Sequence, residues 1–445
     1  MGADDDGVLW DVVEEHLDEA EFGLERFNAL LDSAILTLDN LADVEVLLDA
    51  HVDGLVVGGK PVAERLLLPL LADTEAAPAR IAAAALALLA AGDNEAVAGA
   101  LVHASRFVRK GALWAGRLAA NPRLDAAVSR GLSLPATERG ALVQLAAERR
   151  LAIPPLLSLL ASPTEDEQVG ALRAATPADP QQVAGVEQLM GSTNERVHQA
   201  AMLAGLEYGS HRAWGLCQSA ALRSERPNPL ALALFAGLAD PTQQAQLYQL
   251  TQSERHKYAA FGCLGYTGNA LLVPWLIQQA SSEDERTAKL AGEAFSIITG
   301  AEELVLSDTV SQPGTPSTLP AEDAEAKQAL PPLEEDDLDA DIAPGEDDAL
   351  PRPNAPALAN WWQANGGRFD ARFRYLAGAP LSFDTFRLAL QTFPLRRRHV
   401  LSALLAVRTA GALRLDTRGF TRTQRAQLAQ IPSGHAPWAR QYSGF

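Results

Sequence analysis

The sequence predicts an all-α protein, an α-solenoid of helix pairs over residues 61–304. A helical cap over 1–60 precedes it, and a disordered acidic linker and a small helical C-terminal module follow. Three observations lead to this prediction. Apolar segments recur at a period of about 30 residues, which is typical of repeat architectures. The chain lacks the apolar/polar alternation of half-buried strands. Charge is divided into blocks that sum to −19.

Residues 8–60 are expected to form helices that cap the repeat array. The stretch VVEEHLDEAEFGLERFNALL is amphipathic at helical spacing, and LADVEVLLDAHVDGLVVGG follows it. An array needs such an element, because its end repeat would otherwise expose an apolar face that has no neighbour. His51 and Asp53 are the most enzyme-like pair in this region. Two residues apart on a helix, they point about 200° away from one another, so helix-end capping is the preferred interpretation.

Eight segments between residues 79 and 300 share one pattern. Each has a polar start, a run of Ala, Leu and Gly, and then a Gly, Asp, Asn or Pro break before a second apolar helix. Residue types that cap helix N-termini stand just before a Glu-Arg pair in four segments, at Thr137, Asn194, Ser253 and Asp284. Small residues at the segment centres, such as Gly111 and Gly170, should let neighbouring helices approach closely. The pattern therefore predicts stacked helix pairs.

One segment carries a recognisable repeat motif. LGYTGNALLVPWL, at 264–276, resembles the short type of HEAT-like repeat, in which L-G-x-x-G-(D/N) ends one helix and V-P-x-L lies in the next. LAAGDNEAVAGAL, at 89–101, matches this motif less closely. The resemblance implies the fold. It implies little about function, because such repeats serve scaffolds, adaptors and a few enzymes alike.

Residues 305–354 are expected to form an acidic, proline-rich linker. Between 322 and 351 there are 12 acidic residues and one lysine, with few residues that could form a core. DLDADIAPGEDD, at 337–348, places three aspartates with the spacing of a calcium-binding EF-hand loop. That loop needs glycine where Ile342 stands, and it needs two flanking helices, which the neighbouring prolines oppose. An electrostatic strap is therefore preferred over a metal site.

Residues 355–445 are expected to form a basic helical module. From 352 to 445 the chain has 14 arginines, no lysine and three acids, and aromatic residues lie among the arginines. Such a segment could bind nucleic acid or phosphate, or it could dock on an acidic surface. Its charge of +11 is matched by −11 over 322–351. Self-association or docking on an acidic partner is therefore the favoured hypothesis, and nucleic acid is the weaker one.

Catalytic and cofactor motifs are not recognisable in this sequence. The eight histidines form no HExxH motif and no Cys/His cluster, and no GxxxxGK[ST] or GxSxG pattern occurs. We therefore expect no catalytic residues, no cofactor and no metal. Cys217 and Cys263 are too few for a disulfide framework, which indicates a reducing compartment and a role in the core.

No membrane or export segment is expected. The chain begins with the acidic MGADDDG, unlike a secretory signal. Its longest apolar run, IAAAALALLAAG, falls well short of the roughly 20 residues that a bilayer requires. The sequence therefore predicts a cytoplasmic protein that does not bind membranes.

A curved array offers a long surface on which a few side chains set the affinity for a protein partner. The candidate partner-binding residues are Trp114, Trp214, Tyr258, Tyr266, Trp275, Arg374, Tyr375, Arg396, Arg397 and Arg398. The sequence leaves open the identity of the partner, the face used and the oligomeric state.

Over nearly its whole length the chain resembles an uncharacterised proteobacterial family whose members often lie near type VI secretion genes. The resemblance rests on the helix around His16 and on AHVDGL (50–55), KLAGEAFSIITG (289–300), WW (361–362), RYLAGAPL (374–381) and RRRH (396–399). It implies a role in secretion or effector handling and carries over no catalytic residue. The first hypothesis is a non-enzymatic scaffold or adaptor that binds a protein partner, such as an effector or spike component. The alternatives are a lyase-type enzyme, by analogy with phycobilin lyases, and nucleic-acid binding through the Arg-rich module.

Overall fold

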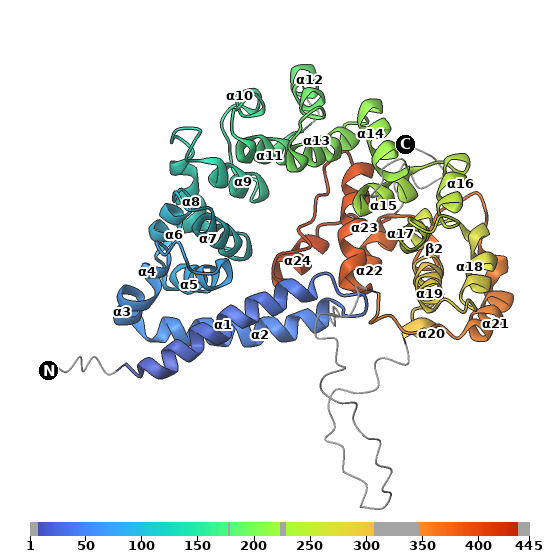
Figure 1. The fold of residues 1–445 in the computed structure, drawn as a ribbon, viewed down its shortest axis with the longest axis horizontal. Helices are drawn as coiled ribbons and strands as arrows, with labels where there is room; N and C mark the ends of the chain where they lie inside the picture. The colour runs from blue at the N-terminus through green and yellow to red at the C-terminus, as the bar shows by residue number, and fades with distance from the viewer. Residues whose placement is uncertain (1–7, 177–178, 223–227, 307–346, 435–445) are drawn as a thin grey trace, which may run out of the picture.

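The computed structural model describes residues 8–176, 179–222, 228–306 and 347–434, and these residues form an all-α fold, as predicted (Figure 1). The described strands are two residues each: β1 (Tyr375–Leu376) and β2 (Ala379–Pro380) pair antiparallel. The predicted linker is described only at its two ends. Its aspartates at 337–341, on which the calcium and strap interpretations rest, lie outside the described residues.

A helical hairpin forms the N-terminal end of the molecule. Its helices are α1 (Trp10–Leu30) and α2 (Leu38–Val57), followed by the short α3 (Gly59–Val62), the π-helical turn η1 (Ala63–Leu67) and α4 (Leu68–Leu70). In α1, Val13, Leu17, Ala20 and Leu24 are buried, and their steps of three and four residues keep them on one face. Both helices of the hairpin pack on α5, so the hairpin covers the first helix of the array.

The array that follows is an arc with two layers of helices (Figure 1). The inner layer contains α5 (Pro78–Ala91), α7 (Arg106–Leu118), α9 (Gly140–Glu148), α11 (Glu165–Ala174), α13 (Glu195–Glu207), α15 (Pro229–Leu238), α17 (Lys257–Leu264) and α19 (Glu285–Thr299). The outer layer contains α6 (Asn94–Ala100), α8 (Pro122–Gly131), α10 (Leu156–Leu160), α12 (Pro180–Leu189), α14 (His211–Leu222), α16 (Pro241–Leu250) and α18 (Val273–Gln279). The 3-10 turns η2 (Gly265–Thr267) and η3 (Ala270–Leu272) precede α18, and α20 (Glu303–Leu306) follows α19.

Small residues bring the inner helices close together, as the sequence predicts. A β-carbon on Gly111 of α7 would lie 2.6 Å from the side chain of Ile81 in α5. A β-carbon on Gly170 of α11 would lie 2.8 Å from Val143 in α9. Real β-carbons do not approach other atoms so closely, so the helix spacing depends on these glycines.

Two of the four predicted helix caps are confirmed. The side chains of Asn194 and Asp284 accept hydrogen bonds from backbone N–H groups in the first turns of α13 and α19. The prediction is wrong for Thr137 and Ser253. Residues 135–139 and 253–256 form turns instead, so α9 begins at Gly140 and α17 at Lys257. In both places a hydrogen-bonded turn includes the Glu-Arg pair, so the helix begins after the pair and not at it.

The C-terminal segment packs on the last repeat of the arc through α21 and then enters the concave side. Its elements are α21 (Ala355–Asn365), η5 (Gly366–Arg368), the β1–β2 hairpin, α22 (Phe383–Thr392), α23 (Leu395–Arg408) and α24 (Thr421–Leu428). In Figure 1 the red helices α22 to α24 occupy the centre of the arc, and α23 packs on both α13 and α15. The module therefore forms part of the same core as the array.

The N-terminal hairpin and the C-terminal segment meet at the N-terminus of α23. Backbone N–H groups of Leu395 and Arg396 donate to the carbonyls of Leu36 and Ser33, in the turn between α1 and α2. The first N–H groups of a helix have no partner within the helix, and here the hairpin supplies one. On α24, the N–H and hydroxyl of Thr421 both donate to the carboxylate of Glu45 in α2. The arc is thus closed by its own C-terminal segment.

Candidate functional site

An ionic junction joins the C-terminal segment to α19. It consists of the side chains of Arg396, Arg397, Glu293, Glu302 and Asp347. The Nε atoms of both arginines lie 3.0 Å from Oε1 of Glu293. Arg397 also donates to Glu302 at 2.7 Å, and Arg396 to Asp347 at 2.8 Å. Three segments that are distant in sequence therefore meet at two adjacent arginines.

The junction is buried and charged. Arg397 has no exposed side-chain surface, and Glu293 is 4% exposed. Burial opposes the charge of the guanidinium groups, but the neighbouring carboxylates hold the pKa of both Arg396 and Arg397 above the usual value. Each charge is compensated by an opposite one. Such a group of ion pairs positions the helices rather than binding a ligand.

The RYLAGAPL segment docks beside the junction. The N–H of Tyr375 donates to the carbonyl of Gly268 at 2.8 Å, and the N–H of Ala377 donates to the carbonyl of Ile297 at 2.9 Å. Gly268 and Gly300 both have positive φ, +62° and +72°. A β-carbon on either would lie 2.6–2.8 Å from backbone atoms of this segment. The ends of η2 and α19 must therefore carry glycine for the segment to approach.

Arginine side chains cap the C-termini of three inner helices. Two of these arginines belong to the C-terminal segment and the third follows α9 in the array. Arg374 donates to the carbonyl of Ala239 after α15, Arg414 donates to that of Ala175 after α11, and Arg149 donates to that of Ala119 after α7. A cation is favoured there because the last carbonyls of a helix lack partners and carry partial negative charge. Arg374 and Arg414 thus tie the C-terminal segment to the array.

The predicted partner-binding residues of the C-terminal module are mostly buried, and this corrects their assignment. Arg374 and Tyr375 are about 5% exposed, and Arg397 and Arg398 at most 1%. Tyr375 lies against Phe369, with ring centroids 4.7 Å apart. Arg398 donates to the carbonyl of Leu390, and burial lowers the pKa of its guanidinium to about 10. These side chains hold the module on the array, so a partner cannot reach them in this conformation.

The predicted aromatic anchors of the array also serve internal packing. Trp214 is buried and stacks on Phe235, with ring centroids 5.7 Å apart. Trp275 stacks on Phe261 at 5.4 Å. The hydroxyl of Tyr258 donates to Asp284, and the half-buried Trp114 packs against the core. These rings therefore contribute to the packing of the array rather than standing free on its surface.

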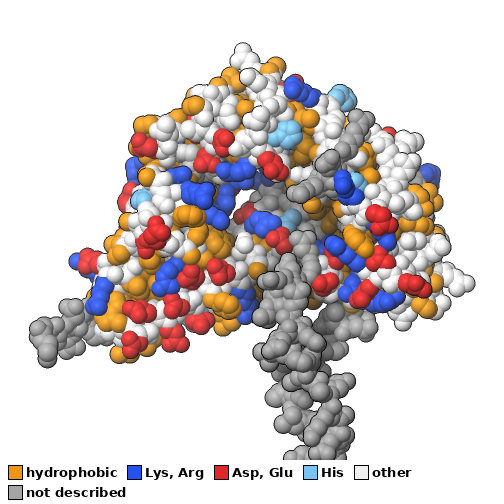
Figure 2. All heavy atoms as spheres, viewed as in Figure 1, with side chains coloured by type: hydrophobic (Ala, Val, Ile, Leu, Met, Phe, Trp, Pro, Cys, Tyr) orange, Lys and Arg blue, Asp and Glu red, His pale blue; other side chains and the backbone are white. Residues whose placement is uncertain are grey.

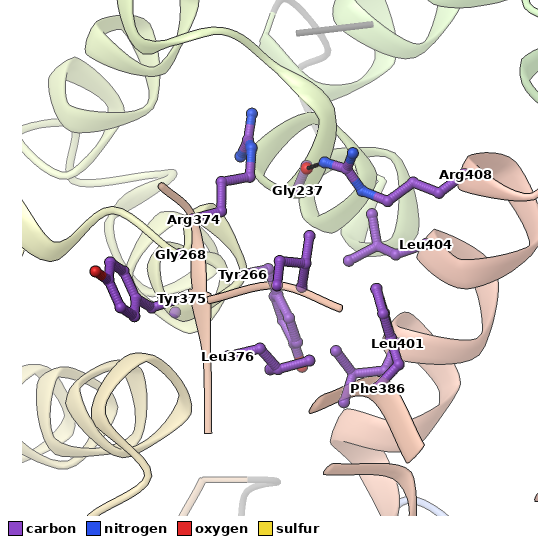
Figure 3. Close-up of a pocket in the computed structure, with 12 residues that line it drawn as sticks. Gly237, Tyr266, Gly268, Arg374, Tyr375, Leu376, Phe386, Leu401, Leu404 and Arg408 are labelled. Carbon is purple, nitrogen blue, oxygen red and sulfur yellow. Dashed lines mark hydrogen bonds between the residues drawn. The ribbon is translucent and has the colours of Figure 1, made fainter. Parts of the chain in front are cut away.

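Tyr266 lines a small cavity between the array and the C-terminal segment (Figure 3). The cavity has a volume of about 20 Å³, which is room for about one water molecule. In Figure 3 the side chains of Leu401, Leu404 and Phe386 converge on it from one side and Tyr266 and Leu376 from the other. This cavity is too small to admit an organic substrate.

Other reactive side chains are in inert surroundings. Cys217 and Cys263 are unpaired and buried, and burial raises the pKa of both thiols to about 12. They therefore stay protonated at neutral pH, as core residues would. Across the described ranges, no three His, Cys, Asp or Glu side chains are grouped so that they could hold a metal ion.

Sequence reasoning missed two arrangements. Glu293 was not singled out, although a lone carboxylate inside the apolar KLAGEAFSIITG is an unusual signal that a buried cation must lie nearby. His16 and His51 were considered separately, but their Nδ1 atoms lie 3.2 Å apart across α1 and α2. Asp53 is exposed and does not contact His51, which agrees with the sequence geometry.

The outer surface carries acidic and apolar side chains together. Figure 2 shows them side by side over α1 and α2, at the lower left. Within the part of the chain that the structure describes, no helix is long and apolar enough to cross a membrane. Comparison of the chain with protein-family models and with curated protein sequences finds no match.

Proposed function

We propose that this chain is a non-enzymatic scaffold or adaptor of the cytoplasm that binds a protein partner. The observation that carries the proposal is the closed arc, in which the chain's own C-terminal helices fill the concave side. The even-numbered helices of the outer layer, from α6 to α18, and the N-terminal hairpin face outward. A body of this kind offers broad outer surfaces rather than a pocket.

The partner class follows from the resemblance of the sequence to a family found near type VI secretion genes. An effector or a spike component is the partner that this resemblance suggests. The short HEAT-like repeat supports the same class of function, since such repeats often present binding surfaces. Three motifs of the resemblance, KLAGEAFSIITG, RYLAGAPL and RRRH, lie at or beside the ionic junction, where they hold the C-terminal segment on α19.

The two alternatives have less support. Nucleic-acid binding through the C-terminal module would need guanidinium groups that are free to meet phosphate. Arg396, Arg397 and Arg414 are engaged with carboxylates and carbonyls. The more exposed arginines Arg418, Arg422 and Arg425 pair with aspartates of the N-terminal hairpin. A lyase-type enzyme would need a cavity that holds its substrate. The cavity at Tyr266 has room for about one water molecule. A larger hollow of about 360 Å³ lies between α6 and α8, and its charged lining residues Glu95 and Arg130 pair with one another.

Affinity purification of the tagged full chain from its own cytoplasm, with and without nuclease, tests the proposal. We expect one near-stoichiometric polypeptide that survives nuclease and is identified by mass spectrometry. Loss of every partner on nuclease treatment would instead support nucleic-acid binding, and the absence of any retained partner would contradict the adaptor function.

A further inference from the structure

Exposed large apolar side chains are concentrated on the N-terminal hairpin. Of the eleven that are exposed in the described residues, six lie between residues 9 and 57. They are Leu9, Val12, Phe22, Val46, Leu47 and Val57, and Val57 reaches 86% exposure. Isolated exposed apolar residues are normal on a protein surface, but a group on one pair of helices marks a contact site.

These side chains lie on one side of the hairpin. On α2, residues 46, 50, 53 and 57 follow steps of four, three and four and are all exposed, which places them on one helix face. On α1, Glu15, Glu19 and Phe22 follow the same spacing and are also exposed. Where the helices meet, Gly54 contacts the ring of His16, and Gly23 contacts Leu48. We call the solvent-facing side formed by Val12, Phe22, Leu47 and Val57 the outer hairpin face.

The other sides of the hairpin are already covered. Asp18 and Glu21 of α1 form ion pairs with Arg80 of α5. On α2, Glu45 and Asp49 contact Thr421 and Arg422 of α24. Arg425 of α24 also reaches Asp39, at the end of the helix face that carries Val46 and Asp53. Since α5 and α24 occupy these sides, the outer hairpin face is the side of the hairpin that remains open to a partner.

Acidic groups lie among the apolar side chains of this face. Glu15, Glu19, Asp43 and Asp53 are exposed, and no ion pair or hydrogen bond of their side chains occurs within the described residues. Across residues 10–57 the chain has 13 acids and one cation, Arg26. The face therefore combines apolar contact area with negative charge that is not neutralised.

We propose that the outer hairpin face binds a basic amphipathic α-helix of the partner protein. A third helix would pack on α1 and α2 with apolar residues at i, i+3, i+4 and i+7, and its flanking Lys or Arg would lie near Glu15, Glu19 and Asp53. This inference rests on the proposed adaptor function and specifies its contact surface.

The charge of the face disfavours other occupants. A second copy of the chain would bring the same acidic face against itself, and like charges at close range repel. Nucleic acid and anionic lipid would meet the same repulsion. A helix with cationic flanks is instead attracted, and its attraction should weaken as salt rises.

Two synthetic 20-residue helical peptides test the proposal with the full-length protein. Both carry the same leucine stripe, and one has Lys and Arg flanks whereas the other has Glu flanks. We expect fluorescence anisotropy to give at least tenfold tighter binding of the basic peptide, about 1.4 kcal/mol. Equal binding of the two peptides, or no binding of the basic one, would overturn the proposal.

Variants locate the contact. Leu47→Ser combined with Val57→Ser should weaken binding of the basic peptide at least tenfold, and Glu15→Lys combined with Glu19→Lys should do the same and favour the acidic peptide. The matched control is Leu271→Ser combined with Leu388→Ser, at residues that are 70% and 47% exposed on other elements. A loss in the control equal to that in the first pair would argue against a specific site.

The fate of the captured partner separates this inference from the adaptor function. A polypeptide that wild-type protein retains, and that the Leu47/Val57 variant loses, supports both. Full retention by the variant overturns the outer hairpin face and leaves the adaptor function standing. Peptide selectivity without any captured protein supports the face and contradicts the adaptor function as proposed. A dimer of the chain that the same variant dissolves would identify a second copy as the occupant instead.

Discussion

At the residue scale, the molecule depends on a few buried charges that compensate one another. Glu293 accepts hydrogen bonds from two arginines in the middle of α19, where it is the buried charged residue among apolar and hydroxyl side chains. A buried pair is not in itself strongly stabilising, because both ions lose their hydration. Removing one partner is costly, however, because the other is left charged in a medium that solvates it poorly.

We predict that Glu293→Gln destabilises the protein by about 3–5 kcal/mol, because Arg396 and Arg397 would lose their shared carboxylate. Urea unfolding would measure the change. The control is Glu285→Gln on the same helix, which removes a solvent-exposed pair with Lys289 and should leave the urea midpoint close to that of wild type. Equal effects of the two substitutions would show that burial of the junction contributes nothing.

A second prediction concerns acid stability at Asp284. Burial opposes ionisation of this carboxyl, but hydrogen bonds from Lys257 and Thr287, each 2.6 Å long, hold its pKa below the usual 3.8. A lowered folded-state pKa means that the ionised group stabilises the fold above pH 3.8 and that this contribution is lost as pH falls below it.

Asp284→Asn should therefore lower the urea midpoint at pH 7, and the difference from wild type should shrink as the pH falls from about 4 toward 2. Urea titrations across this range would measure it. Asp43→Asn, at an exposed carboxyl without an ion pair, should keep the pH dependence of wild type. A constant difference between the Asp284 variant and wild type at all pH values would refute the assignment.

At the scale of elements, the ends of helices decide how the C-terminal segment docks. The RYLAGAPL segment contacts α19 on one side and α22 on the other through β1. It lies across the C-terminal ends of η2 and α19, where helix carbonyls without internal partners accept its N–H groups. Gly268 and Gly300 are the residues at these ends, and their positive φ directs the chain away so that the segment can approach.

We predict that Gly268→Ala costs at least about 1 kcal/mol more than Gly209→Ala. Both glycines have positive φ, +62° and +71°, so both substitutions bear the left-handed penalty of about 1–2 kcal/mol. Only at Gly268 would the new β-carbon also meet Tyr375, at 2.8 Å, whereas nothing lies within 4 Å at Gly209. Thermal unfolding of both variants would measure the difference, and equal losses would mean that the segment does not press on Gly268.

At the scale of the whole molecule, the C-terminal segment joins regions that lie far apart in the sequence. α24 contacts the N-terminal hairpin through Thr421 and Glu45, while α23 contacts α19 through Arg396 and Glu293. The array and the module therefore share one core instead of forming a solenoid with a separate appended unit. Residues 307–346 connect the array to the module in the chain. The contacts described above between the array and the module are made by residues outside this segment.

A protease site inserted between residues 325 and 330 tests this view. After cleavage we expect the two pieces to elute together as one species in size-exclusion chromatography, because buried ion pairs and backbone hydrogen bonds still hold them. The Glu293→Gln protein cleaved in the same way should separate at least in part. Complete separation of the wild-type pieces would show that the covalent connection is needed.

Local patterns predicted a large part of the fold. Helical spacing and the period of the segments predicted the all-α class. The excess of arginine over 355–445 suggested contact with an acidic surface, but which carboxylates it meets, such as Glu293, became visible only in the structure. The predicted helix caps were half right, since Asn194 and Asp284 cap helices but Thr137 and Ser253 lie in turns. Turns that precede a helix depend on packing against the next unit, which a local motif does not encode.

The sequence by itself determined which residues are apolar, which are charged and at what spacing, and hence the helices and the excess of acid on the hairpin. Only the tertiary structure decided which side chains face solvent. Arg397 and Trp214 were predicted to bind a partner, yet both are buried, whereas the apolar Val57 and Leu47 are exposed. The physical reason is that exposure depends on where the C-terminal segment folds back, and that contact joins residues more than 300 positions apart, as between Glu45 and Thr421.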